Sequence, residues 1–159
     1  MLSDVVIDTN VFIHAQNPAE KRSLAAKDFL ESLLEVTTEL CVDGLFNLNS
    51  PHLSKIAHEY LTMIPPIGLG YAILVRLLQS GRVKMNVSTN LPPEKRRLVV
   101  RLVRDPRDKT FVYVAFNSED TILTSHDWVD FPERVREIIR KQLLVTIEEA
   151  SETIARIHE

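Results

Sequence analysis

The chain has 159 residues, a length that suits one domain with a sizeable hydrophobic core. Its composition, 45% apolar and 26% charged residues, is that of an ordinary soluble globular protein. The net charge of -3 argues against a protein that coats nucleic acid in bulk, although it leaves room for a local basic groove. Cys41 is the only cysteine, which excludes a disulfide and a cysteine-based zinc site and leads us to expect a cytoplasmic protein.

No stretch of the chain is suited to crossing a membrane. The most apolar window, residues 63–75, contains two prolines and two glycines and is shorter than the roughly 20 residues that a spanning helix needs. We therefore expect no membrane association. No internal repeat or linker divides the sequence, so we predict a single domain over residues 1–159.

The first elements are predicted from β-branched residues and from capping signals. Residues 4–7 read DVVI, and consecutive β-branched residues favour a buried strand. Residues 17–34 predict a helix in which Asn17 is the cap, Pro18 lies in the first turn and Glu20 completes a capping box.

Two further helices are predicted in the middle of the chain. Residues 50–64 form the first, with Ser50 as its cap and Pro51 in its first turn. The second runs over residues 69–79 and ends before Gly81.

The remaining elements continue an alternation of strands and helices. Asp105 followed by proline predicts a capped start for one of these helices. We expect strands at 39–43, 82–87, 121–125 and 143–147, and helices at 92–104, 105–116, 131–142 and 148–159. Such alternation favours an α/β fold, a three-layer α/β/α sandwich with a central parallel sheet.

Four acidic residues stand where such a fold would bring them together. Asp8 follows the first strand and Asp127 follows the strand at 121–125, and ligands bind beyond the carboxyl ends of parallel strands. Glu59 lies on a predicted helix and Asp108 lies in the first turn of another. Clustered carboxylates repel one another unless a cation neutralises them, and Mg²⁺ and Mn²⁺ prefer oxygen ligands.

The chain resembles the PIN-domain ribonucleases. VVIDTNVFI is similar to their first-strand motif and carries Asp8, and AHEYL is similar to their helical acidic motif and carries Glu59. DPRDKTFVYVAF carries Asp108, and TILTSHDWVDF carries Asp127. The four motifs occur in the family's order over nearly the whole chain, and the DPRD form is most similar to toxin-like PIN proteins of type II toxin–antitoxin systems.

The resemblance implies a metal-dependent endoribonuclease that leaves 5′-phosphate and 3′-hydroxyl ends. Asp8, Glu59, Asp108 and Asp127 would be the catalytic residues and would hold one or two Mg²⁺ or Mn²⁺ ions. The expected partners are an RNA substrate, an antitoxin protein and a second copy of the chain in a homodimer.

Four residues beside these acids are expected to support them. Thr9, Asn10 and Ser125 would orient ligands or water. Asp130 stands three residues after the last acid, whereas the family pattern places a further Asp two residues after it. A ligand role for Asp130 therefore stays open.

A basic run, EKRRLVVRLVRDPRDK, precedes and overlaps the third acidic motif. Arg97, Arg101 and Arg104 share one helix face, and Arg107 lies next to Asp108, so these arginines are candidate RNA-binding residues that follow phosphates. The alternative is a solvated face of an amphipathic helix.

Other interpretations of the acids stay open. Asp8 can be a turn residue, and Glu59 can form an ion pair with Lys55 one helix turn earlier. Trp128 either stacks on a base or is partly buried in the core. A haloacid-dehalogenase-type phosphatase would need Asp-x-Asp where this chain has Asp8-Thr9-Asn10. The alternative function is a catalytically weak PIN-like module that binds RNA or protein.

Overall fold

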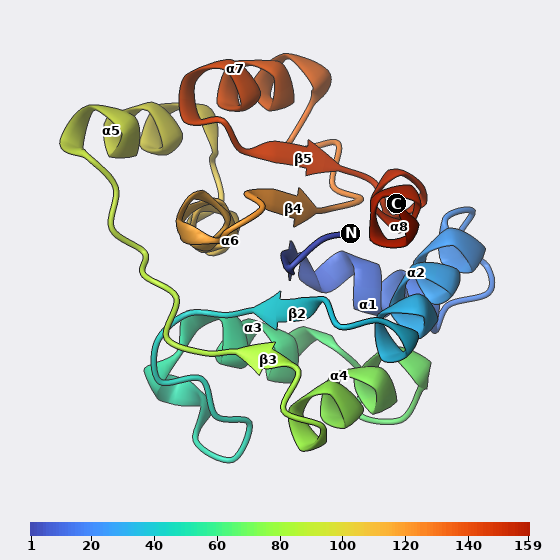
Figure 1. Ribbon diagram of the computed structural model, residues 1–159. Coiled ribbons are helices and arrows are strands. Elements are labelled where there is room, and N and C mark those ends of the chain that lie inside the picture. The colour runs from blue at the N-terminus through green and yellow to red at the C-terminus, as the bar shows by residue number, and fades with distance from the viewer.

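Five short parallel strands form the centre of the protein in a computed structural model of residues 1–159 (Figure 1). Every neighbouring pair is parallel, and the strand order is β3-β2-β1-β4-β5. The strands are β1 (Asp4–Ile7), β2 (Glu39–Cys41), β3 (Val83–Lys84), β4 (Ile122–Thr124) and β5 (Thr146–Glu148). The predicted parallel α/β architecture is confirmed.

Eight α-helices cover the sheet in two groups. The first group contains α1 (Thr9–Ala15), α2 (Ser23–Glu35), α4 (Leu69–Gln79) and α8 (Ala150–His158), which pack against one another. The second contains α3 (Lys55–Met63), α5 (Pro93–Leu102), α6 (Pro106–Asn117) and α7 (Glu133–Leu143). In Figure 1 α2, α4 and α8 lie on one side of the strands and α5 and α6 on the other, so the layers are helix, sheet and helix.

The strand order places β1 and β4 side by side in the middle of the sheet. Ile7 is in register with Thr124, and the Asp8 N–H donates a hydrogen bond to the Thr124 carbonyl at 2.9 Å. All four residues of β1 are buried, as the run of β-branched residues predicts. The carboxyl ends of these two strands therefore open onto the same place, and Asp8 stands at it.

One predicted helix begins later than its capping signal indicates. Helix α2 starts at Ser23, whereas Asn17 was predicted as the cap. The Asn17 side chain accepts the Ala19 N–H and Glu20 accepts the Arg22 N–H, so both polar groups stabilise a turn instead of a helix start. The chain before this turn forms a helix that was not predicted, α1.

The helix predicted at 50–64 is divided into two parts. Residues Pro51–Leu53 form a single 3₁₀ turn, and α3 begins after it. Its cap is Ser54, whose hydroxyl accepts the Ala57 N–H at 3.0 Å, whereas Ser50 makes no capping contact. The prediction of Ser50 as the cap was wrong because Pro51 suits a 3₁₀ turn as well as an α-helical one.

The other elements agree with their predictions to within a few residues. Helix α4 has the predicted bounds, and Asp105 caps α6 through the Arg107 N–H. Strand β3 is shorter than predicted, and β5 begins at Thr146 because α7 runs on to Leu143. None of the helices combines the length and the apolar character that crossing a bilayer requires.

Helices α1 and α4 approach each other closely at Gly70. A Cβ atom at Gly70 would overlap the backbone carbonyl of Phe12. An exposed Gly→Ala change in a helix stabilises it by up to about 1 kcal/mol, but here backbone would have to move. We expect Gly70→Ala to lower the free energy of unfolding by about 1–3 kcal/mol, measured by urea denaturation.

Gly44→Ala is the matched control, because the nearest atom to its Cβ would be Asn86 Oδ1 at an ordinary contact distance of 3.9 Å. The control should change the free energy of unfolding by no more than about 0.5 kcal/mol. A Gly70→Ala protein as stable as the wild type would contradict the close approach of α1 and α4.

Candidate metal centre

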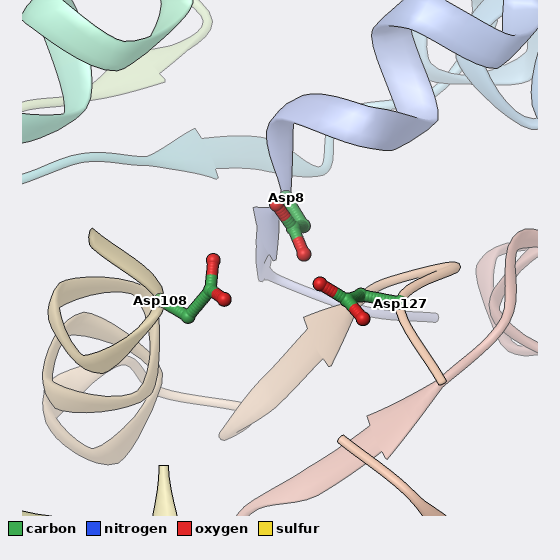
Figure 2. A group of neighbouring side chains, drawn as sticks. All are labelled: Asp8, Asp108 and Asp127. Atoms are coloured by element: carbon green, nitrogen blue, oxygen red, sulfur yellow. The ribbon is translucent and has the colours of Figure 1, made fainter. Parts of the chain in front are cut away.

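Three carboxylates from distant parts of the chain face one space at the carboxyl edge of the sheet (Figure 2). Asp8 follows β1, Asp108 lies in the first turn of α6, and Asp127 lies in the loop after β4. An oxygen atom from each lies within 4.8 Å of an oxygen from the other two. Three of the four predicted catalytic acids thus come together.

Asp8 is held in place by two neighbouring polar side chains. Its Oδ2 atom accepts hydrogen bonds from Ser125 Oγ at 2.7 Å and from Asn10 Nδ2 at 3.2 Å. Asp8 is the N-cap residue of α1, but its side chain makes no capping hydrogen bond. The carboxylate therefore turns away from the helix it precedes and toward the other acids, as Figure 2 shows.

The supporting residues also connect the first strand to the loop after β4. Asn10 Oδ1 accepts the His126 N–H at 3.1 Å, and Ser125 Oγ accepts the Asp127 N–H at 3.1 Å. Two of the predicted supporting residues, Asn10 and Ser125, therefore bridge Asp8 and the segment that carries Asp127.

Thr9 has a different environment from the other supporting residues. Its side chain is buried and lines the same pocket as Asp8 and Glu59, yet its hydroxyl has no hydrogen-bond partner in the chain. A buried hydroxyl without a partner is unfavourable, so this position calls for a water or ligand atom.

Each carboxylate of the cluster keeps an oxygen for a ligand. Asp127 Oδ1 accepts the N–H groups of Val129 and Asp130, both at 2.9 Å, while its second oxygen has no donor from the chain. Asp108 has the side chain of Asp130 as its one hydrogen-bond partner. None of Asp8, Asp108 and Asp127 forms an ion pair with a lysine or arginine.

Arg136 holds the segment that carries Asp127 and was not predicted. The side chain is buried and donates hydrogen bonds to the carbonyls of Phe131 at 2.7 Å, Asp127 at 3.0 Å and Ser125 at 3.3 Å. Burial lowers the pKa of the guanidinium, although nearby Glu149 opposes this. A sequence signal did exist, because Arg136 falls on the apolar stripe that α7 presents to the core.

Trp128 and His126 of the same loop contact neighbouring elements. Trp128 is 41% exposed, its indole N–H donates to Glu149 at 2.6 Å, and the Arg136 guanidinium covers its ring at 3.7 Å from the centroid. The rings of His14 and His126 stack, with their Nδ1 atoms 2.9 Å apart. His126 Nε2 accepts the Ala150 N–H, so these histidines pack the loop against α1 and α8.

Glu59 lines the pocket but does not join the cluster of three carboxylates. Its Oε2 atom lies 3.7 Å from an Arg107 nitrogen, and Arg107 also pairs with Asp105 at 2.8 Å. The ion pair with Lys55 that the sequence permitted is not formed. Arg107, expected at the RNA, therefore lies between two acids of the pocket wall.

A second group of carboxylates shares Asp108 with the first. Oxygen atoms of Asp105, Asp108 and Asp130 also lie within 4.8 Å of one another. Asp105 is the cap of α6, as predicted, and is paired with Arg107, which lowers its pKa. Asp130 belongs to the pocket wall and lies beside Asp108, which gives it a place next to the centre.

Burial and the charges of neighbouring carboxylates raise the pKa values of Asp8 and Asp108. Burial raises the pKa of Asp8 to about 6, against the hydrogen bond from Ser125, and the charge of Asp127 adds to the increase. Burial and then the charge of Asp8 raise the pKa of Asp108 to about 8. A divalent cation would replace these protons and remove the repulsion between the carboxylates.

No protein-family model, curated protein or solved structure matches this chain.

The pocket at the acids has a volume of about 210 Å³. It combines carboxylates without basic partners, an unpartnered hydroxyl and one arginine shared by two acids, which is chemistry suited to a cation and to an anion that it binds.

The raised pKa values give the cation-free protein an unusual pH dependence. Folded Asp8 and Asp108 keep their protons to a pH of about 6 and about 8, whereas unfolded Asp loses its proton near 3.8. The folded state binds more protons in this window, so the free energy of unfolding falls as the pH rises from about 4 to about 8. The measurement is urea denaturation in EDTA at several pH values.

Asp108→Asn should remove much of this decrease in stability with rising pH. It should raise the free energy of unfolding at pH about 8 by about 1–3 kcal/mol relative to the wild type. Asp28→Asn, a change at an exposed site on α2, is the control and should follow the wild type. Wild type and Asp108→Asn with the same dependence on pH would show that Asp108 is not a strained carboxylate.

Proposed function

We propose that this protein is a metal-dependent endoribonuclease that hydrolyses RNA phosphodiester bonds. The observation that carries the proposal is the cluster of Asp8, Asp108 and Asp127, three carboxylates with no basic partner at the carboxyl edge of a parallel sheet. The order of the four acidic motifs, which resembles that of PIN-domain ribonucleases, supports the same reading.

The donor set fits Mg²⁺ or Mn²⁺. Every candidate ligand is an oxygen atom, and the buried Thr9 hydroxyl lacks a partner beside them. A bound ion of this kind supplies a Lewis acid that neutralises a phosphodiester and lowers the pKa of a water molecule.

The residues of the chain divide the work between holding and orienting. Asp8, Asp108 and Asp127 would hold the cation, and the hydrogen bonds from Ser125 and Asn10 fix the Asp8 carboxylate. The backbone that carries Asp127 is fixed in turn by the buried arginine of α7.

Arg107 gives the site a group for the substrate phosphate. It is more than half exposed and paired with Glu59 and Asp105, so an arriving phosphate can take over its hydrogen bonds. That exchange would free Glu59 to turn toward the cation. Glu59 could therefore still be a ligand, although it lies outside the cluster of three carboxylates while it is paired with Arg107.

A second candidate function is a PIN-like module that binds RNA or protein without cleaving it. The pairing of Arg107 with Glu59 and Asp105 favours it, because an internal cation already neutralises part of the acidic pocket. Carboxylates of the main cluster lack such a partner, so we place the nuclease first.

The test is cleavage of a pool of single-stranded and structured RNAs with Mn²⁺ or Mg²⁺ and with EDTA. The wild type should cleave only with the metal, and Asp8→Asn should lower the rate at least about 100-fold, because it removes a negative ligand at the centre. Asp28→Asn, remote and exposed, should cleave like the wild type.

Binding of Mn²⁺ is measured on the same proteins by calorimetry and by thermal unfolding. The wild type should bind and gain thermal stability, and Asp8→Asn should lose most of both. If neither protein binds Mn²⁺ or cleaves RNA while both still bind RNA, the module becomes the better account. Cleavage that persists in Asp8→Asn would exclude this acidic cluster as the active site.

A further inference from the structure

The acidic pocket is the first of three adjoining cavities, and the other two lie along α5 and α7. Asp130 forms part of the wall of the acidic pocket and of the next cavity, which has a volume of about 340 Å³. Arg101 lies in that middle cavity and also in a third, of about 280 Å³, which ends at Gln142 of α7. Each neighbouring pair of these cavities shares a wall residue, and we call the middle cavity and the third, outer cavity together the groove.

The middle cavity gathers arginines that have no partner. Arg101, Arg104 and Arg134 line it, all three are exposed, and none forms a hydrogen bond or an ion pair through its side chain. Arg22 and Arg156, by contrast, pair with glutamates elsewhere on the surface. The only acid in the middle cavity is Asp130, at the end where it meets the candidate metal centre.

The cations continue in a line along α5. Arg97 and Lys95 line the outer cavity together with Arg101, and Glu94 is the one acid beside them. Arg97 and Arg101 are one helical turn apart, so they lie about 6 Å apart along the axis. Arg104 follows the end of α5 on the side of the acidic pocket, because Asp105 caps the next helix. The line of positive charge therefore points at the carboxylates.

Apolar side chains share the middle cavity with these arginines. They are Leu102, Val129, Pro132 and Val135. The Val129 side chain is 89% exposed, although its own backbone is held by a hydrogen bond from its N–H to Asp127 Oδ1. Basic side chains bind the phosphates of a nucleic acid, and apolar side chains beside them can contact its bases. Bases are free for such contacts in a single strand, whereas in a duplex they are stacked and paired.

We infer that this groove, lined by Arg97, Arg101, Arg104, Val129 and Arg134, binds single-stranded polynucleotide and delivers it to the acidic pocket. The arginines contact the phosphates, which gives affinity without base specificity. Only the cleavage of the delivered strand rests on the proposed function, because the groove cations need no metal to bind phosphate. An acidic protein segment is the competing occupant, and a polyglutamate probe distinguishes it from a polynucleotide.

The experiment measures binding of a fluorescein-labelled oligouridylate of about 12 nucleotides by fluorescence anisotropy, in EDTA, so that no cleavage occurs. Four phosphate contacts predict a slope of about -3 for the logarithm of the association constant against the logarithm of salt concentration. Affinity should thus fall about 50-fold between about 50 and about 200 mM salt. A protein with Arg101→Gln, Arg104→Gln and Arg134→Gln keeps Arg97 and should retain only about a quarter of this slope.

The matched control carries Arg76→Gln and Arg140→Gln. Both arginines are exposed and unpaired in the same way, but Arg76 lies on α4 and Arg140 lines a different cavity. The control should bind the oligonucleotide like the wild type. Equal binding by the triple variant and the control, or no binding by the wild type, would overturn the inference.

Further probes distinguish the possible occupants. A DNA oligonucleotide of the same length reports whether the groove needs the 2′-hydroxyl, and either answer is consistent with phosphate contacts. A blunt duplex should bind at least about 10-fold more weakly, and equal or tighter duplex binding overturns the choice of a single strand. Polyglutamate that binds as tightly as the oligonucleotide, and loses binding in the triple variant, would assign the groove to an acidic protein.

The groove and the proposed nuclease fail in different ways. Asp8→Asn in EDTA should bind the oligonucleotide at least as tightly as the wild type, because Asp8 lines the acidic pocket and not the groove, and its negative charge repels phosphate. Binding that depends on the three arginines without any metal-dependent cleavage would leave the groove in place and remove the nuclease. Cleavage that is unaffected in the triple variant at every salt concentration would remove the groove as the substrate path.

Discussion

Repulsion among carboxylates buried at the carboxyl edge of the sheet is the constraint on which the rest of this site depends. Asp8 cannot move away, because its N–H pairs with Thr124 and its side chain is bonded to Ser125 and Asn10. The hydrogen bonds that fix it also bring Asp127 close, so stability of the scaffold and strain in the site have the same origin. In the proposed function a bound cation would relieve this repulsion, and this is why the acids, and not the helices around them, indicate a function.

Much of the fold follows from local signals that agree with the final packing. Helix α4 and the Asp105 cap of α6 were predictable because periodicity, proline and the capping residue all indicate the same start. The predictions failed where two local solutions compete, as at Asn17, whose side chain serves a turn as readily as a helix. Helix α1 was missed because it is short and follows a strand directly, and only its packing on α2 and α4 makes it stable.

The convergence of three acids was predictable, and the contacts that support them were less so. Asp8 and Asp127 follow strands and Asp108 lies in the first turn of a helix, so topology alone brings them together. The partner of Glu59 depends on the reach of Arg107 from another helix, which no spacing in the sequence encodes. Arg136 lies on the apolar face of its helix, where a buried charge is unfavourable unless it is hydrogen-bonded. The backbone carbonyls that accept its hydrogen bonds are visible only in the structure.

The contact between His14 and His126 fixes where each ring carries its proton. His126 Nε2 accepts the Ala150 N–H, so its own hydrogen must reside on Nδ1, and that hydrogen is donated to His14 Nδ1. His14 is then the Nε2–H tautomer. A second proton on either ring would break one of these bonds, and burial lowers the pKa of both histidines. The contact between α1 and the loop that carries Asp127 therefore consists of two neutral imidazoles in opposite tautomers, which add no positive charge next to that loop.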